Sequence, residues 1–83
     1  MAGQMSIDLT DGTDLNDIKT NGPYFIRVGT NAPGEYFHFN VLQNMNTGDL
    51  VQYGFVMRAT INMYIRNLFN GAWTPWKSVN ING

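Results

Sequence analysis

The chain has 83 residues, no cysteine and a formal net charge of −1, with six acidic and five basic residues. The basic residues are scattered, so they form no stripe that could neutralise nucleic-acid phosphates, and no apolar run approaches the ~18 residues of a membrane span. This composition argues against nucleic-acid binding, membrane insertion and a disulfide-stabilised fold, and predicts one small domain with a marginal core.

The chain is expected to begin with an accessory segment. Residues 1–10 are interpreted as an N-terminal extension or cloning remnant, the remnant being Met1 to Gln4, and residues 11–83 as the domain. The segment MAGQMSIDLT lacks the charged and apolar regions of a signal peptide, so any export is expected to use another route.

One short helix is predicted early in the domain. Asp14 is the expected N-cap, and Asp17, three residues later, completes a capping box. Leu15 and Ile18 share a face and are expected to dock on the core, and Asn21-Gly22 supplies a stop. We expect one or two helical turns.

The remainder reads as short strands separated by turns. Gly54 lies inside one strand and predicts a bulge or a close backbone approach, and Asn70-Gly71 predicts a two-residue hairpin. The expected fold class is mainly β, a small antiparallel meander or sandwich-like knob of about five strands with one short N-terminal helix. The expected strands are Tyr24–Val28, Glu35–Leu42, Leu50–Arg58, Ile61–Phe69 and Ala72–Val79, with Tyr24, Ile26, Val28, Phe37, Phe39 and Val41 facing inward.

The hairpin predicts where the two tryptophans lie. Opposed residues share a face, which pairs Leu68 with Trp73, Ile65 with Trp76, Tyr64 with Lys77 and Phe69 with Ala72. The core face would then hold Ile61, Met63, Ile65, Phe69 and Trp76, and the outer face Tyr64, Arg66, Leu68, Trp73 and Lys77. Pro75 cannot donate to a ladder, and a bulge at Thr74-Pro75 would instead put both tryptophans on one face.

The outer face supplies the candidate ligand-binding residues Tyr64, Arg66, Trp73 and Lys77. Aromatic rings stack on the apolar faces of sugars, while amides and hydroxyls satisfy sugar hydroxyl groups. The alternative is that this face packs against a neighbouring protomer, which would add buried apolar area to a weak core.

Catalytic and metal chemistry have little support. There is no cysteine, one histidine and no G-x-S-x-G elbow, so we expect no catalytic residue. His38 is expected on an outer strand face, with a metal ligand on a trimer axis as the alternative. The acidic residues Asp8, Asp11, Asp14 and Asp17 lack EF-hand spacing, so turn formation and capping are favoured over calcium binding. No cofactor or metal is expected.

Several of these segments together resemble one family. The pieces are Asp14–Ile18, Asn21–Ile26, Asn31–Gly34, a strand ending in Val41, Val51–Tyr53, Tyr64–Arg66 and the closing GAWTPW of Gly71–Trp76. In this order, from about Asp11 to Val79, they resemble the pyocin knob domain of bacteriophage and R-type pyocin tail fibres. The aromatic segment Glu35–Asn40 and Pro23 depart from that pattern.

The resemblance implies a small β-rich knob, arranged as a homotrimer near the cell-binding end of an elongated fibre, with no catalytic residue. We therefore expect a structural or receptor-binding module of a phage-type tail fibre or tailspike, located in the virion and acting at the host-cell surface, with a surface glycan as a possible ligand. The alternatives are an accessory domain of a polysaccharide-degrading tailspike and a free-standing carbohydrate-binding protein.

Overall fold

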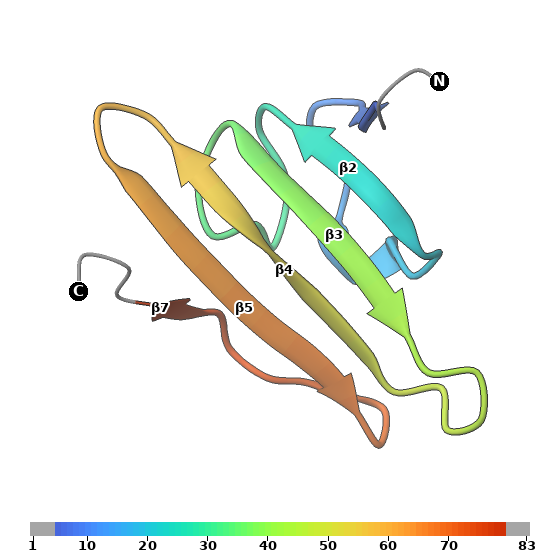
Figure 1. Cartoon of the computed structure of the whole chain (residues 1–83). Helices are drawn as coiled ribbons and strands as arrows, with labels where there is room; N and C mark the ends of the chain where they lie inside the picture. Colours follow the sequence, from blue (N-terminus) through green and yellow to red (C-terminus); the bar gives the residue numbers. More distant parts are fainter. Residues whose placement is uncertain (1–4, 80–83) are drawn as a thin grey trace.

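The structure is a computed structural model that describes residues 5–79, so the interpretation of Met1 to Gln4 as a cloning remnant lies outside the described residues. These residues form one twisted sheet and a single helical turn (Figure 1). The elements are β1 (Ile7–Leu9), η1 (Leu15–Asp17), β2 (Gly22–Ile26), β3 (Phe37–Gln43), β4 (Leu50–Met57), β5 (Ile61–Phe69), β6 (Ala72–Trp73) and β7 (Lys77–Val79).

The sheet is a meander extended at both edges. Strands β2 to β5 pair antiparallel with their neighbours in chain order, β1 pairs with β2 in parallel, and β6 and β7 both pair with β5. The prediction of a mainly β fold is confirmed. There are seven strands in a mixed sheet rather than about five antiparallel ones, because residues 7–9 of the expected extension join the sheet and the last strand is divided.

Where the sequence predicts a helix of one or two turns, the structure has only η1, a three-residue 3-10 turn. Asp14 does cap it, because its side chain accepts a hydrogen bond from the Asn16 backbone N–H at 2.9 Å. Ile18 already has extended backbone angles and ends the turn by donating its N–H to the Leu15 carbonyl. Leu15 is fully buried and Ile18 packs on the core, as predicted.

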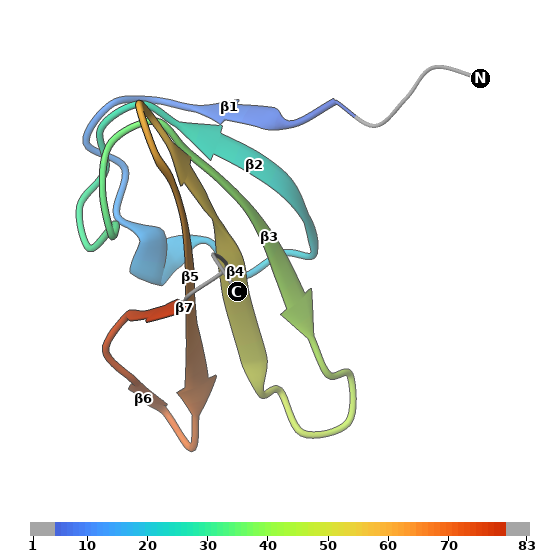
Figure 2. The ribbon, with the colours of Figure 1, turned by 60° about the vertical axis from the view of Figure 1, so that its left-hand side comes forward.

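The core lies on one face of the sheet, which we call the covered face. Figure 2 shows η1 and the segment from β6 to β7 on this side. Val28 was predicted to face inward, but it follows the end of β2 and is exposed. The other five inward predictions are confirmed by a buried cluster of Leu15, Tyr24, Ile26, Phe37, Phe39, Val41 and Leu50. The opposite surface of β2 to β5 is the open face.

Gly54 is a close-approach site and not a bulge. It pairs in continuous register with Phe39 on β3 and Tyr64 on β5. A Cβ added at Gly54 would lie 2.0 Å from the His38 carbonyl oxygen and 2.5 Å from the Phe39 Cα. The backbones of β3 and β4 therefore meet where no side chain fits.

The hairpin between β5 and β6 forms where the sequence predicts it. Asn70 and Gly71 have φ angles of 55° and 82°, the left-handed conformation that this class of two-residue turn requires. Leu68 lies opposite Trp73, and Phe69 opposite Ala72, as predicted. Beyond Trp73 the predicted register is wrong, because Lys77 lies opposite Ile65 and Ser78 opposite Tyr64. Residues 74–76 hold one residue more than the facing part of β5, which is the alternative bulge.

The two faces of β5 are the reverse of the prediction. Arg66 is buried and Tyr64 and Leu68 pack on the core, whereas Ile61, Ile65 and Phe69 are exposed. The neighbouring strand β4 explains this choice. Opposite Tyr64 it presents Gly54, which leaves room for a ring, and opposite Arg66 it presents Gln52, which supplies a hydrogen-bonding partner. Large side chains of β5 therefore fit the covered face best where β4 is small or polar.

We predict that Gly54→Ala lowers the free energy of unfolding by at least ~2 kcal/mol, because the added methyl group collides with backbone that cannot rotate away. Urea unfolding followed by tryptophan fluorescence measures the change. Gly34→Ala is the control, since its added Cβ would meet only the Val56 side chain at 3.2 Å. Equal losses in the two variants would contradict the close approach.

Candidate functional site

The candidate site is built around Arg66, which is 6% exposed on the covered face of β5. Its guanidinium carbon lies 3.9 Å from the ring centroid of Trp73 and 4.6 Å from that of Trp76. These are cation–π contacts, in which the negative face of each indole attracts the cation. The bulge at residues 74–76 is what brings both indoles to one side of the sheet.

Gln52 holds the guanidinium and η1 together. This fully buried side chain on β4 donates through Nε2 to the carbonyl oxygens of Leu15, at 2.8 Å, and Ile18, at 2.9 Å. Its Oε1 accepts from the Arg66 Nε at 2.9 Å. One carboxamide therefore satisfies two carbonyls of the η1 segment and one donor of a buried cation.

A second set of contacts joins Trp76 to the cap of η1. The indole Nε1–H of Trp76 donates to the Asn31 carbonyl at 2.7 Å. The Asn31 side chain donates in turn to the Asp14 Oδ1 at 2.8 Å. Asn31 itself has a φ angle of 59°. Trp76 also meets Phe37 of the core edge-on, with centroids 5.3 Å apart. The loop after β2 is thereby fixed against the tryptophans.

Burial sets the electrostatics of this cluster. It lowers the pKa of Arg66 to about 10, an effect that the negative charge of Asp14 opposes. Arg66 therefore remains a cation at neutral pH. Among residues 5–79, its Nη2 and the Asn16 Oδ1 are buried side-chain atoms without a hydrogen-bond partner. The two indoles and the Gln52 carboxamide are the groups that compensate the desolvated charge.

An open depression lies over this cluster. It combines half-buried indole rings with amide and hydroxyl groups, which suits contact with a ligand that has both apolar faces and hydroxyls. Its walls come from η1, the loop after β2, β5 and the bulged segment. They are formed by Asn16, Asn31, Ala32, Arg66, Trp73, Thr74, Pro75 and Trp76, and we call this surface the Trp–Arg depression.

The four residues that the sequence predicts as ligand-binding do not share one exposed face. Arg66 and Trp73 line the Trp–Arg depression. Tyr64 is half-buried on the same face but packs beside Gly54, and Lys77 is exposed opposite Ile65, on the open side of the sheet's edge. Trp76 packs on the core, as predicted, but Trp73 packs there too, so the predicted outward position of Trp73 is wrong. Both indoles contact Arg66, which is the alternative arrangement with both tryptophans on one face.

Sequence reasoning missed six of the eight residues that line the depression, among them Trp76, Asn31 and Asn16. The sequence predicts Trp76 on the face of the sheet opposite to Trp73. The signal for its observed position is Pro75, which marks the bulge. Asn16 lies in η1 and Asn31 in the loop after β2, both remote in sequence from β5, and no local pattern connects them to that strand.

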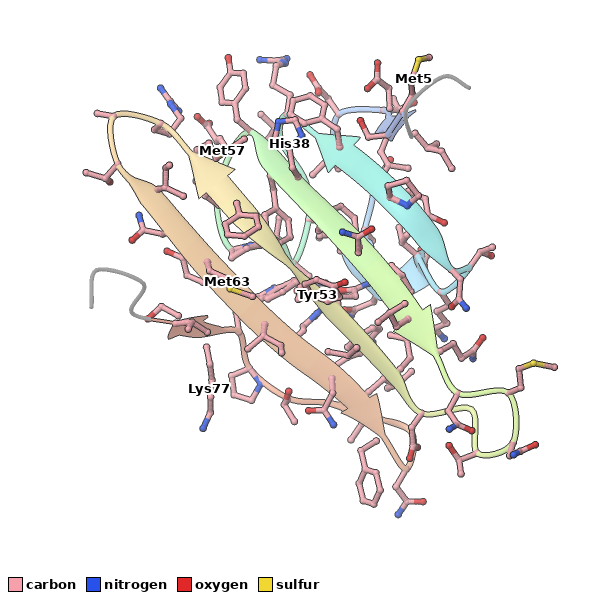
Figure 3. The ribbon with its side chains drawn as sticks, viewed as in Figure 1. Met5, His38, Tyr53, Met57, Met63 and Lys77 are labelled. Atoms are coloured by element: carbon pink, nitrogen blue, oxygen red, sulfur yellow. The ribbon has the colours of Figure 1, made fainter. Side chains whose placement is uncertain are left out.

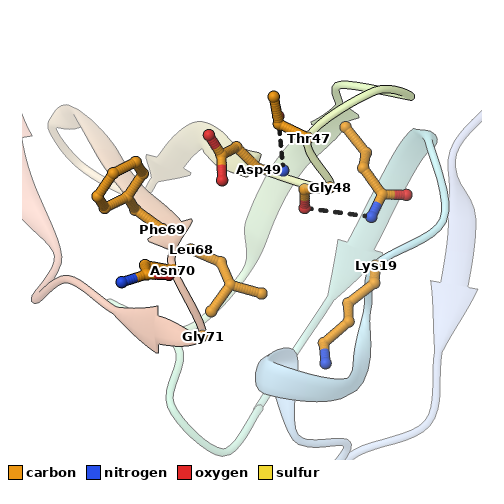
Figure 4. A pocket seen from close by; sticks show the side chains of 9 residues that line it. Lys19, Thr47, Gly48, Asp49, Leu68, Phe69, Asn70 and Gly71 are labelled. Atoms are coloured by element: carbon orange, nitrogen blue, oxygen red, sulfur yellow. Dashed lines mark hydrogen bonds between the residues drawn. The ribbon is translucent and has the colours of Figure 1, made fainter.

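A second depression lies at the end of the sheet where the turns meet (Figure 4). It is formed by the turn between β3 and β4, the 70–71 hairpin and Lys19, with internal hydrogen bonds from the Gln43 side chain to the Gly48 carbonyl and from the Asp49 N–H to the Thr47 hydroxyl. Its one aromatic ring is the exposed Phe69. The Trp–Arg depression, with two indoles, is the better candidate.

Asp11 and His38, two of the polar residues singled out in the sequence, make contacts away from the depression. Asp11 pairs with Arg27, and the His38 ring lies 4.6 Å from that of Phe25 on the open face. Across residues 5–79, no three acidic, histidine or cysteine side chains converge on a point that could hold a metal ion. Within the same range, no helix has the length and apolar character to cross a membrane.

Comparison with known proteins found no matching family model, no matching curated protein and no matching solved structure.

We predict that Gln52→Leu lowers the free energy of unfolding by about 3 kcal/mol or more, since each buried polar group left without a partner costs ~1–3 kcal/mol. The variant strands the Ile18 carbonyl and the Arg66 Nε. Gln43→Leu is the matched control, because that side chain makes a single exposed contact, to the Gly48 carbonyl at 3.4 Å. Chemical denaturation of both variants is the measurement, and similar stabilities would contradict the bridging role.

The Asp14 cap predicts a pH dependence. Hydrogen bonds from the Asn31 side chain and the Asn16 backbone lower the pKa of Asp14, with a smaller contribution from Arg66. The folded pKa therefore lies below the unfolded value of ~3.9, so the carboxylate stabilises the fold above about pH 4 and less as pH falls through the folded pKa. Asp14→Ala should be less stable than wild type at pH 7, with a gap that narrows towards about pH 3 in thermal unfolding. A gap independent of pH would refute this.

Proposed function

We propose that this chain is a structural and receptor-binding knob of a phage-type tail fibre or tailspike, which attaches to polysaccharide on the host-cell surface and catalyses no reaction. The observation that carries the proposal is the Trp–Arg depression. Two indoles, two asparagines and a threonine surround one open surface there. This is the combination that recognises the apolar faces and the hydroxyls of a sugar.

The rigidity of the depression also supports binding. Trp76 is held by Asn31 and Phe37, and Arg66 by Gln52, so the ring positions are fixed before a ligand arrives. A preorganised surface loses little conformational entropy on binding. A preorganised surface of this kind suits a protein that presents many copies of a low-affinity binding site.

The proposal includes assembly as a homotrimer within a fibre, in the virion and exposed to the host surface. The order of sequence segments that resembles the pyocin knob supports it. So does the small one-sided core, because a domain of this size gains stability by burying apolar surface against other copies.

Binding to a panel of bacterial surface polysaccharides tests the proposal, with Asn16→Ala as the diagnostic variant. The Asn16 side chain lines the depression, and its Oδ1 is buried without a hydrogen-bond partner, so truncation removes an unsatisfied buried atom and should leave the thermal midpoint unchanged or raised. We predict selective binding by wild type and an affinity about fivefold to tenfold lower in the variant, the equivalent of one hydrogen bond of ~1 kcal/mol.

The matched control is Asn46→Ala, the same substitution in the exposed turn between β3 and β4. It should bind as wild type does. Absence of binding by folded wild-type protein to every polysaccharide would overturn the receptor role and leave a spacer. Release of shortened saccharides would instead identify an enzyme.

A further inference from the structure

The open face of the sheet is mostly apolar, with His38, Asn40 and Asn67 as its polar side chains on β3 and β5, although nothing in residues 5–79 covers it. Figure 3 shows Tyr53, Met57 and Met63 on this side of the ribbon. Large side chains continue across neighbouring strands in register, so that Phe55 lies opposite Met63, and Met63 opposite Val79. Seven of the apolar side chains on this face are more than a third exposed, namely Leu42, Phe55, Met57, Ile61, Ile65, Phe69 and Val79.

This pattern differs from that of a sheet face made for water. Along a strand with one solvated side, apolar side chains normally point to the core and polar side chains to the solvent. On β5, however, the open side carries Ile61, Met63 and Ile65, whereas the covered side carries Asn62, Tyr64 and Arg66. The side of β5 that looks like a core face in the sequence is thus the one that a single chain leaves open.

The lack of charge on the open face favours contact with other copies of the same chain. Strands β2 to β5 place no aspartate, glutamate, lysine or arginine there, and Lys77 stands at its margin on β7. When the same face of every copy points at a shared axis, a charge on that face lies close to like charges of the other copies, so a charged face repels itself. A face without charges avoids that penalty.

The size of the face is close to that of a stable interface. Four strands at ~4.8 Å spacing and eight residues at ~3.3 Å per residue span roughly 500 Å², to which β7 and the projecting side chains add. A standard stable interface buries about 800 Å² per partner. The open face therefore approaches that requirement without any rearrangement.

We propose that the open face is the self-association surface of this chain, on which copies pack sheet against sheet around a shared axis. The inference rests on the assembly in the proposed function and adds the surface through which it occurs. It leaves the Trp–Arg depression facing outward, because that depression lies on the opposite side of the sheet.

Sedimentation equilibrium of wild type and three lysine variants tests this. Met57→Lys and Ile65→Lys introduce a charge on the open face, at side chains 45% and 36% exposed, whereas Met45→Lys makes the same change as Met57→Lys in a turn, at a side chain 96% exposed. We expect wild type and Met45→Lys to form one assembly, and the two open-face variants to raise its dissociation constant at least tenfold. Circular dichroism and tryptophan fluorescence confirm that each variant is folded.

The outcomes separate this inference from the proposed function. Wild-type protein that stays monomeric to about 100 μM would overturn the inference, since a standard interface is far tighter. Open-face variants that assemble like Met45→Lys would overturn it too, by placing the interface elsewhere. Polysaccharide binding per chain should survive in folded monomeric Ile65→Lys, so its loss there, with wild-type binding intact, would contradict the separation of the two faces.

Discussion

The buried carboxamide of Gln52 is the constraint on which the rest of the structure depends. A turn as short as η1 leaves carbonyl groups that must be bonded before it can lie on an apolar sheet, and Gln52 bonds two of them. The same side chain fixes Arg66, whose guanidinium then orders both indoles. Trp76 leads through Asn31 back to the cap of η1, so the contacts form a closed ring. The covered face and the depression above it are therefore one unit.

Local signals in the sequence predicted the elements whose cause is local. The alternation of Phe37, Phe39 and Val41 identified the inner face of β3, and the Asn70-Gly71 pair located the last hairpin. Gly54 marked a close approach because no other residue tolerates that backbone contact. Each of these signals depends on neighbours within a strand or a turn, and a single sequence contains all the information needed to read them.

The predictions from the sequence are wrong where contacts between distant parts of the chain determine the structure. Alternation shows that β5 has two faces but does not say which one is buried, and the choice depended on Gln52 and Gly54 in the neighbouring strand. The added residue between Trp73 and Lys77 reversed the expected side of one tryptophan, since a slip of one residue moves every later side chain to the other face. The parallel pairing of β1 has no local pattern at all.

The incorrect assignment of β5 is itself informative about assembly. Both sides of this strand carry large side chains, because both sides have something to bury in the proposed assembly: the covered side meets the core and the open side meets another copy. This arrangement keeps charges off the open face, which is the proposed self-association surface. The buried cation Arg66 lies on the covered face, where Gln52 and the indoles compensate its charge. A ligand at the depression would then act on groups that assembly does not disturb, so that each added copy contributes an independent binding site and avidity grows with the number of chains.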